Sequence, residues 1–223
     1  MTVGVQLLVP IKPLHSAKTR LRGGEIPPGK HAELVTALAL DTVLAAEAAE
    51  RVLRVIVVTS DPELTRRFRD HGVEVLADAP LAGLNAALRH GDGVLRERLP
   101  HVRTGALQAD LPALRGGELD GAIAEAGAER ACCADRQGTG TTLLLASSGA
   151  PLRPSFGPGS AAAHREGGAN PLRGPWESLR CDVDTEADLR TAARLRLGEH
   201  TRALLRDEAP ELLDRWAGCP DTV

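Results

Sequence analysis

The sequence has very few aromatic residues: Phe and Trp contribute two each, and tyrosine is absent. The core must therefore be aliphatic, and aromatic platforms for stacking nucleic-acid bases are missing. Positive charge is not in excess either, because 27 Lys and Arg residues are outnumbered by 30 Asp and Glu residues. A net charge of −3 and an isoelectric point near 6.2 argue against a nucleic-acid-binding protein.

The four cysteines form no ligand or redox pattern. Cys132 and Cys133 are adjacent, whereas Cys181 and Cys219 stand alone, which excludes CxxC and zinc-ligand spacing. No apolar run approaches the roughly 20 residues that span a membrane, and no signal-peptide pattern opens the chain. GxxxxGK[ST] and strand-linked GxGxxG motifs are absent, which disfavours a Walker-type NTPase or a dinucleotide fold. We expect a reduced, cytoplasmic protein with no membrane partner.

What is present is an alternation of strand-like and helix-like segments, which predicts an α/β fold with a mainly parallel sheet flanked by helices. With 223 residues and no Pro/Gly/Ser-rich linker, residues 1–223 suit one domain that ends in a helical tail at about 200–223. An apolar face of the first helix is expected at Leu34, Val35, Leu38, Thr42 and Ala45. The segment 102–107, which precedes Asp110, is polar for a buried strand, so we expect the end of this strand to be irregular.

A cationic loop follows the first strand. The chain has only three lysines, and Lys12 and Lys18 lie in this loop together with Arg20. In α/β proteins such a loop presents charge to phosphorylated ligands at the carboxyl edge of the sheet. The alternative is that these are solvated loop charges.

Three aspartates are candidate ligands for a hard divalent cation, which prefers carboxylate oxygen. Asp110 follows the strand 102–107 and precedes Pro112, although an Asp in that setting also caps turns. Asp182 and Asp184 are two apart, so in an extended segment both carboxylates face one cavity. Asp184 could instead stabilise the start of the next helix, but Thr185 is able to cap that helix itself.

Two loops are rich in glycine and hydroxyl groups. The segment 135–141, Asp-Arg-Gln-Gly-Thr-Gly-Thr, separates two apolar pieces and suits either an anion or a hairpin turn. The segment 156–161, Phe-Gly-Pro-Gly-Ser-Ala, opens a short helix whose N-terminus would attract phosphate.

In this order, the segments resemble the guanylyltransferases of deazaflavin coenzyme F-420 biosynthesis. The resemblance covers residues 5 to 190 and is carried by VPIKPLHSAKTRL, GLNAAL, QADLPAL, ADRQGTGTTLL, FGPGSAAAH and CDVDTEADL. It implies a single-domain GT-A-like (Rossmann-like) nucleotidyltransferase fold. It also implies transfer of GMP from GTP to a phosphorylated three-carbon acid, with release of pyrophosphate.

Position by position, the resemblance implies that Asp110, Asp182 and Asp184 bind Mg²⁺. Lys12 and Lys18 would face the triphosphate, with Lys18 catalytic alongside the aspartates, and Leu84 and Asn85 would lie near the base. Thr141, Gly157 and Ser160 match the positions that hold the acid. Gly159 stands where relatives can carry Asp.

We therefore expect a guanylyltransferase acting on phosphoenolpyruvate or 2-phospho-L-lactate. The motifs do not distinguish these acids, although the Arg-rich composition is typical of chains in which the acid is phosphoenolpyruvate. The alternatives are a nucleotidyltransferase for a sugar phosphate or molybdopterin-type substrate, and an inactive nucleotide-binding module. Because the family's product is labile, the downstream transferase that consumes it is a candidate partner.

Overall fold

The computed structural model describes residues 4–14, 21 and 29–217. In these residues the strands form one mixed sheet in the order β3-β2-β1-β4-β6-β5-β7. Its first four strands are parallel, whereas β6 runs antiparallel to both β4 and β5. The bounds are β1 Val5–Pro10, β2 Val52–Thr59, β3 Glu74–Ala77, β4 Arg103–Leu107, β5 Ala131–Ala134, β6 Thr141–Leu145 and β7 Asn170–Pro171.

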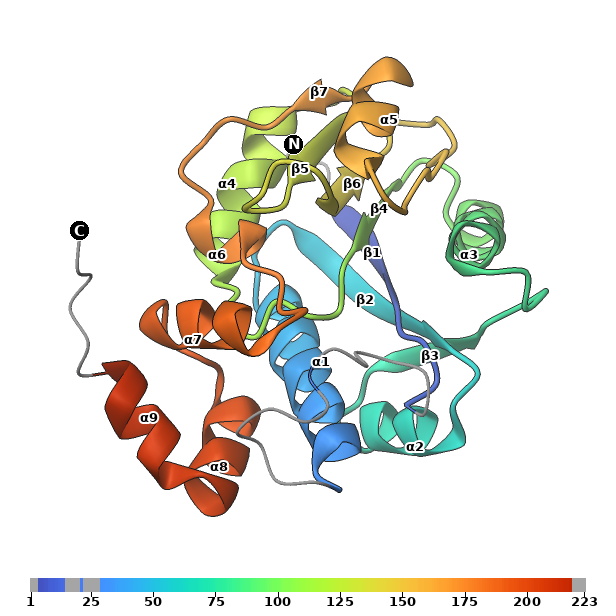
Figure 1. The fold of residues 1–223 in the computed structure, drawn as a ribbon. Helices are drawn as coiled ribbons and strands as arrows, with labels where there is room; N and C mark the ends of the chain where they lie inside the picture. Colours follow the sequence, from blue (N-terminus) through green and yellow to red (C-terminus); the bar gives the residue numbers. More distant parts are fainter. Residues whose placement is uncertain (1–3, 15–20, 22–28, 218–223) are drawn as a thin grey trace.

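Helices follow most strands, as the alternation in the sequence predicts (Figure 1). The first four are α1 His31–Glu47, α2 Pro62–Asp70, α3 Leu84–Arg98 and α4 Gly116–Ala126. Short helices α5 Ser160–Glu166 and α6 Glu177–Arg180 follow β6 and β7. The chain continues into α7 Glu186–Arg194, α8 Glu199–Glu208 and α9 Pro210–Ala217.

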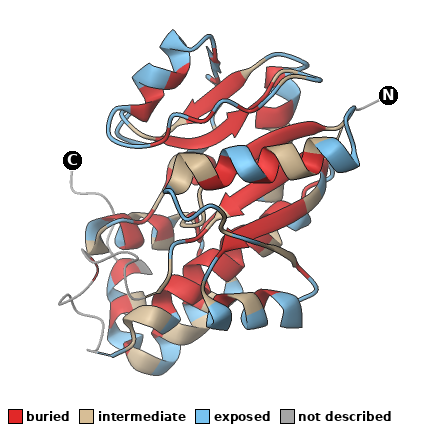
Figure 2. Cartoon of the chain, turned by 90° about the vertical axis from the view of Figure 1, so that its right-hand side faces the viewer, coloured by how far each residue is buried: buried red, intermediate tan, exposed pale blue. Residues whose placement is uncertain are grey.

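Helices cover both faces of the sheet. Alternate side chains of β1 point to opposite faces, so Leu7 joins a core with α1, α2 and α4, while Leu8 joins a core with α3. Figure 1 shows the strands lying between α1 and α3. In Figure 2 the central strands are buried along almost their whole length, which explains why β1 and β2 are continuous apolar runs. The edge strands β3 and β7 are only partly buried or exposed.

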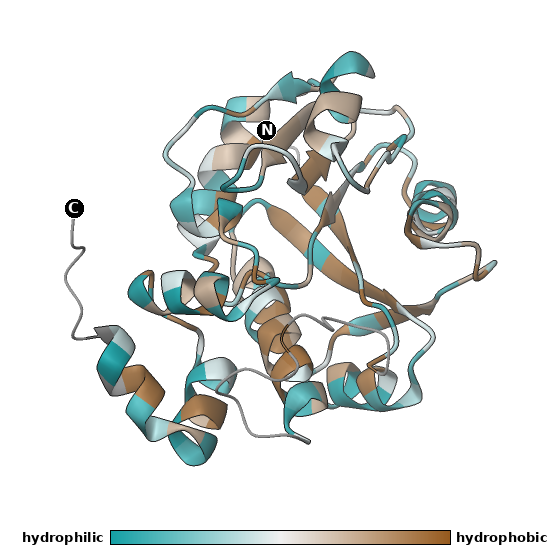
Figure 3. Ribbon diagram, viewed as in Figure 1, coloured by the Kyte–Doolittle hydropathy of each residue, from teal (hydrophilic) through white to brown (hydrophobic). Residues whose placement is uncertain are grey.

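The first helix differs from the expected one-faced pattern. Every residue from Leu34 to Val43 in α1 is buried, including Asp41 and Thr42. The reason is a third layer, because α7, α8 and α9 pack on the side of α1 that faces away from the sheet. Figure 3 shows the middle of α1 as hydrophobic as the strands, whereas α8 and α9 carry mixed surfaces.

The polar strand β4 is regular, contrary to our expectation of irregularity. It pairs with β1 on one side and β6 on the other, and all five of its residues are buried. The guanidinium of Arg103 donates hydrogen bonds to the carbonyls of Ala146, Gly127 and Glu129. These acceptors explain how a charged residue is tolerated inside the sheet.

None of the helices in the described ranges combines the length and apolar character needed to cross a bilayer.

Candidate active site

The candidate residues gather at one edge of the sheet. Because β1 and β4 are parallel, their carboxyl ends lie at the same edge, where Lys12 follows β1 and Asp110 follows β4. The antiparallel strand β6 begins at this edge with Thr141, since Leu143 pairs with Leu107 at the end of β4. The sheet topology therefore places Lys12, Asp110 and Thr141 at the same edge, where α/β proteins commonly bind ligands.

The turn that carries Asp110 is held by the centre of α1. The hydroxyl of Thr42 accepts a hydrogen bond from the Leu111 N–H at 2.9 Å and contacts the Ala109 carbonyl at 3.2 Å. Asp110 itself is half-buried, and one of its carboxylate oxygens is shielded from solvent. Thr42 thus braces the turn rather than serving only as part of an apolar helix face.

The Asp182–Asp184 segment lies directly beside Asp110. The Val183 N–H donates to the Asp110 carbonyl at 2.9 Å, which joins segments more than 70 positions apart. Val183 is fully buried, while Asp182 is half-buried and Asp184 is exposed. Val183 therefore points into the core, while the aspartates on either side of it are more accessible, and a common direction for the two carboxylates stays a prediction.

Asp188 supports this segment from the first turn of α7. Its Oδ2 accepts hydrogen bonds from the backbone N–H groups of Asp184 and Thr185 and from the Thr185 hydroxyl. Its Oδ1 accepts from Arg136 at 3.0 Å. The capping of α7 by Thr185 is confirmed, and it forms a full capping box with Asp188.

The donor set suits a magnesium ion that is shared with a phosphorylated substrate. Within residues 4–14, 21 and 29–217, no three His, Cys, Asp or Glu side chains form a group able to hold a metal ion. Mg²⁺ commonly binds through only one or two carboxylates, with substrate phosphates and waters as the other ligands. Asp110 and Asp182 each have one carboxylate oxygen shielded from solvent, which fits this smaller protein contribution.

The Gly-Thr segment forms the turn of the β5–β6 hairpin. The Asp135 carboxylate accepts the N–H groups of Thr139 at 2.9 Å and Gly140 at 2.7 Å. These two donors are therefore occupied within the loop, which supports the hairpin interpretation over a backbone anion cradle. Thr141 is buried, and its hydroxyl lies 2.9 Å from Nδ1 of His164.

The second loop leads directly into α5. Gly157 and Gly159 have φ values of +143° and +73°, and Ser160 begins the helix with its side chain buried. Gly159 is in the left-handed region, which Asp tolerates better than most residues, so a relative with Asp there keeps a compatible backbone. The helix has seven residues, and the Ala161 N–H donates to the Thr139 carbonyl of the neighbouring hairpin.

Asn85 connects this loop to the start of α3. Its amide nitrogen donates to the Phe156 carbonyl at 2.9 Å, and its amide oxygen accepts the Phe156 N–H at 2.8 Å. Leu84 precedes it as the first residue of α3 and is half-buried against the adjacent core. The side chain of Asn85 therefore fixes the loop that contains Gly157.

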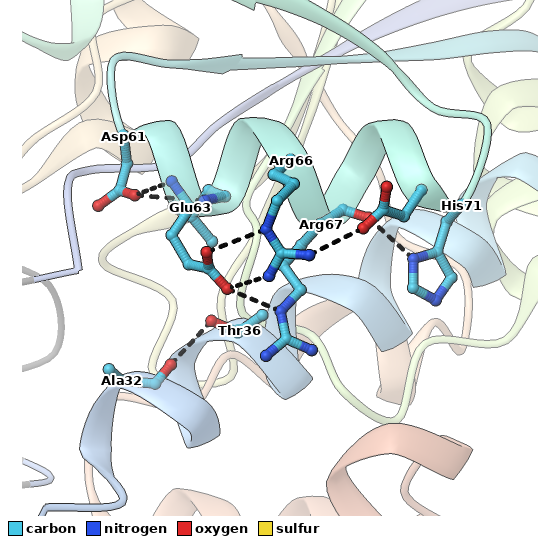
Figure 4. A network of polar contacts seen from close by, with 9 residues as sticks. Ala32, Thr36, Asp61, Glu63, Arg66, Arg67 and His71 are labelled. Atoms are coloured by element: carbon cyan, nitrogen blue, oxygen red, sulfur yellow. Dashed lines mark hydrogen bonds and ion pairs between the residues drawn. The ribbon is translucent and has the colours of Figure 1, made fainter.

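The lysines are only partly covered by the structure. Lys12 is exposed just beyond β1, whereas Lys18 and Arg20 lie outside the described residues. The segment after Lys12 is anchored, because the Leu14 N–H donates to Asp61 at 2.9 Å. Asp61 also caps α2 through Glu63 and Leu64, and Figure 4 shows this cap beside the ion pairs of Glu63 with Arg66 and Arg67.

Two supporting residues were not identified as such from the sequence. Thr42 is a polar residue in the middle of an apolar helix, and this position could have indicated that its hydroxyl bonds to a neighbouring segment, here the Leu111 N–H. His164 lies in the FGPGSAAAH segment, but nothing in its spacing indicates that it contacts Thr141. Such pairs arise from strands and helices that meet only in the tertiary structure.

Comparison with known proteins identifies the family. The sequence model of the family described as "Guanylyl transferase CofC like" matches residues 5–207, nearly the whole chain. The chain belongs to the CofC-like guanylyl transferase family. Its membership makes the protein a nucleotidyltransferase by descent, and the resemblance predicted from the six sequence segments is confirmed.

A curated relative of this guanylyl transferase is the phosphoenolpyruvate guanylyltransferase of Salinispora arenicola. The two are 46% identical over 213 residues, which cover 94% of this chain and 97% of the relative.

Solved structures show the fold. A candidate nucleotide-diphospho-sugar transferase from Desulfovibrio desulfuricans has a TM-score of 0.67 at 20% identity, covering 95% of this chain and 97% of that one. A 4-diphosphocytidyl-2C-methyl-D-erythritol synthase has a TM-score of 0.57 at 18% identity, covering 86% and 98%. The predicted α/β nucleotidyltransferase fold is thereby confirmed.

Proposed function

We propose that this protein transfers GMP from GTP to phosphoenolpyruvate, with release of pyrophosphate, as a step in coenzyme F-420 biosynthesis. The observation that carries the proposal is the hydrogen bond between the Val183 N–H and the Asp110 carbonyl at the carboxyl edge of the sheet. This bond supports the proposal because it joins the turn that carries Asp110 to the segment that carries Asp182 and Asp184. The name of the Salinispora arenicola relative supports phosphoenolpyruvate as the acid.

The reaction needs one bond to form and one to break. A phosphate oxygen of the acid attacks the α-phosphorus of GTP, the bond between that phosphorus and the β-phosphate oxygen breaks, and pyrophosphate leaves. The attacking phosphate is already ionised at neutral pH, so the protein need not supply a general base. Its task is to align two anions and to stabilise the charge on the leaving group.

Each group of residues has a part in this alignment. Asp110, Asp182 and Asp184 would supply the one or two carboxylates that hold Mg²⁺ beside the substrate phosphates, and the bound ion would neutralise triphosphate charge. Lys12 and Lys18 would face the triphosphate as cations. Thr141, Gly157 and Ser160 would hold the acid, and Leu84 and Asn85 would lie near the base. Because both ends of the Asn85 amide hold Phe156, we expect Asn85 to act mainly by fixing the acid-binding loop.

We expect the reaction to run in the cytoplasm. Cys132, Cys133 and Cys181 are free and buried, which suits a compartment that keeps thiols reduced.

Product analysis by mass spectrometry tests the proposal. The protein is incubated with GTP, Mg²⁺ and one of three acids: phosphoenolpyruvate, 2-phospho-L-lactate or 3-phosphoglycerate. We expect a GMP adduct with phosphoenolpyruvate and an equal amount of pyrophosphate. A better yield with another acid would reassign the substrate, and a preference for CTP in a nucleotide panel would point to another nucleotidyltransferase.

Substitution of the carboxylates tests the site. Asp110→Asn and Asp182→Asn should each lower kcat by at least about 100-fold, because a ligand to the charge-neutralising ion is lost. Asp70→Asn is the matched control, since Asp70 is an exposed carboxylate on α2 that pairs with Arg66. Full pyrophosphate release by Asp110→Asn would contradict the mechanism.

A further inference from the structure

A buried histidine connects the segments proposed to hold the acid. His164, in α5, has no exposed surface. Its Nδ1 lies 2.9 Å from the Thr141 hydroxyl at the start of β6. Its Nε2 accepts the backbone N–H of Ser155 at 2.9 Å, so one imidazole contacts both the hairpin and the loop before α5.

These contacts fix the tautomer of the ring. A backbone N–H only donates, so Nε2 must be the unprotonated nitrogen. In a neutral imidazole the proton is then on Nδ1, and Nδ1–H donates to the Thr141 oxygen. Burial, followed by the nearby Arg130 guanidinium, lowers the pKa of His164 to about 4, which keeps the ring neutral near pH 7.

The tautomer in turn decides what Thr141 offers to a ligand. A threonine hydroxyl has one proton, and its oxygen already accepts from the histidine. The hydroxyl proton is therefore available to donate elsewhere. Phosphate and carboxylate oxygens are acceptors, so an acid substrate requires such a donor.

We propose that His164 is a positioning residue that holds the Thr141 hydroxyl as a hydrogen-bond donor toward the phosphorylated acid. This inference rests on the proposed function, in which Thr141 contacts the acid. His164 acts through Thr141 and has no contact of its own with the reacting atoms.

The same ring also fixes the loop that contains Gly157 and Ser160. While Nε2 holds the Ser155 N–H, the next residue, Phe156, packs its ring edge-on to the imidazole with centroids 4.9 Å apart. The backbone N–H and carbonyl of Phe156 are both bonded to the Asn85 amide. Loss of His164 should therefore weaken binding of the acid and leave binding of GTP largely unchanged.

Two substitutions separate the two hydrogen bonds of His164. In His164→Asn, the amide nitrogen takes a place close to Nδ1 and keeps a donor for Thr141. In His164→Gln, the amide oxygen takes a place close to Nε2 and keeps the acceptor for Ser155 only. We expect His164→Gln to raise KM for phosphoenolpyruvate about tenfold, the effect of one lost ligand hydrogen bond, with KM for GTP within about twofold. His164→Asn should recover most of this loss.

A double-mutant cycle shows whether His164 acts through Thr141. Thr141→Val removes the hydroxyl at nearly constant volume and should raise KM for the acid by itself. Adding His164→Gln to Thr141→Val should then have less than about a twofold further effect. Fully additive effects, or equal changes in both KM values, would overturn the inference and leave His164 a structural core residue. An unchanged KM for the acid in Thr141→Val would instead count against the proposed site itself.

The wild-type protein provides a test that does not depend on the folding of any variant. With ¹⁵N-labelled histidine, the NMR shifts and couplings of the His164 ring at pH 7 report which nitrogen carries the proton. A neutral ring protonated on Nδ1 agrees with the proposal. A ring protonated on Nε2, or on both nitrogens, overturns it.

Discussion

At the scale of single residues, Arg103 shows how a buried charge is stabilised by main-chain carbonyls. The residue is 2% exposed, and burial lowers its pKa to about 10, so it remains charged at pH 7. Its three acceptors lie at the end of β6 and in the turn between α4 and β5.

Replacing this guanidinium should be costly. We expect Arg103→Met to lower the free energy of unfolding by about 2–4 kcal/mol, because one buried carbonyl and two partly buried carbonyl contacts lose their donor. Urea unfolding followed by circular dichroism measures this. Arg89→Met, at an exposed site on α3, is the control and should change stability by less than about 0.5 kcal/mol. A loss below about 1 kcal/mol in Arg103→Met would show that water replaces the guanidinium.

His164 gives a pH dependence of stability with a definite sign. Its pKa is about 4 in the folded state and 6.5 in the unfolded state, so the unfolded chain binds more protons between those values. Stability from this group is therefore present above about pH 6.5 and is lost as the pH falls toward 4. Because glutamine does not titrate, the stability difference between wild type and His164→Gln should shrink by about 2 kcal/mol between pH 7 and pH 4.5. A constant difference across that interval would contradict burial of a neutral ring.

At the scale of elements, the start of α7 ties helix capping to the candidate site. The Thr185 side chain caps α7 by accepting a hydrogen bond from the Asp188 N–H. The Asp188 carboxylate in turn accepts a hydrogen bond from the Asp184 N–H. We expect Thr185→Ala to lower the free energy of unfolding by about 1 kcal/mol, as is usual for loss of an N-cap. Thr185→Ser keeps the hydroxyl and should remain within about 0.5 kcal/mol of wild type. Equal losses in both variants, measured by chemical unfolding, would rule out capping as the cause.

At the scale of the whole molecule, α8 is joined to the rest of the protein through Asp41 and Gly198. Asp41, buried in α1, accepts the N–H groups of His200 at 2.9 Å and Thr201 at 2.8 Å. The Gly198 N–H donates to the carbonyl of Pro112 at 2.7 Å, and Pro112 lies two residues after Asp110 in the sequence. The C-terminal helices therefore contact the turn that carries a proposed metal ligand.

The packing at Gly198 is too close for a side chain. A Cβ there would lie 2.3 Å from the Asp41 carboxylate carbon, and a buried carboxylate that caps a helix has little room to shift. We expect Gly198→Ala to lower stability by about 1–3 kcal/mol and to speed amide hydrogen exchange in α8. Gly93→Ala, in α3 with open space around it, is the matched control and should be neutral or stabilising. Similar behaviour of the two variants would contradict the close contact.

Local patterns in the chain were enough to predict the α/β class of the fold. The apolar run of β2 and the Asp-Pro start of α2 are examples of such local signals, because each lies within a few neighbouring residues. The burial of α1 on all sides could not be predicted from local patterns, because it depends on packing against α7, α8 and α9, which are far away in the sequence. The regularity of β4 likewise depends on carbonyls supplied by distant segments.

For the site, the sequence by itself determined the chemistry: the kinds of donor, their order along the chain, and the family to which they belong. Residue type and spacing are properties of the chain, so Asp110, Asp182 and Asp184 could be proposed as ligands from them, and the resemblance to the family added Thr141. Only the tertiary structure decided which groups meet. The pairing of Val183 with Asp110 and the contact of His164 with Thr141 both depend on hydrogen bonds between segments that are distant in the sequence. Such bonds form once burial has brought distant elements together, and nothing in local spacing specifies them.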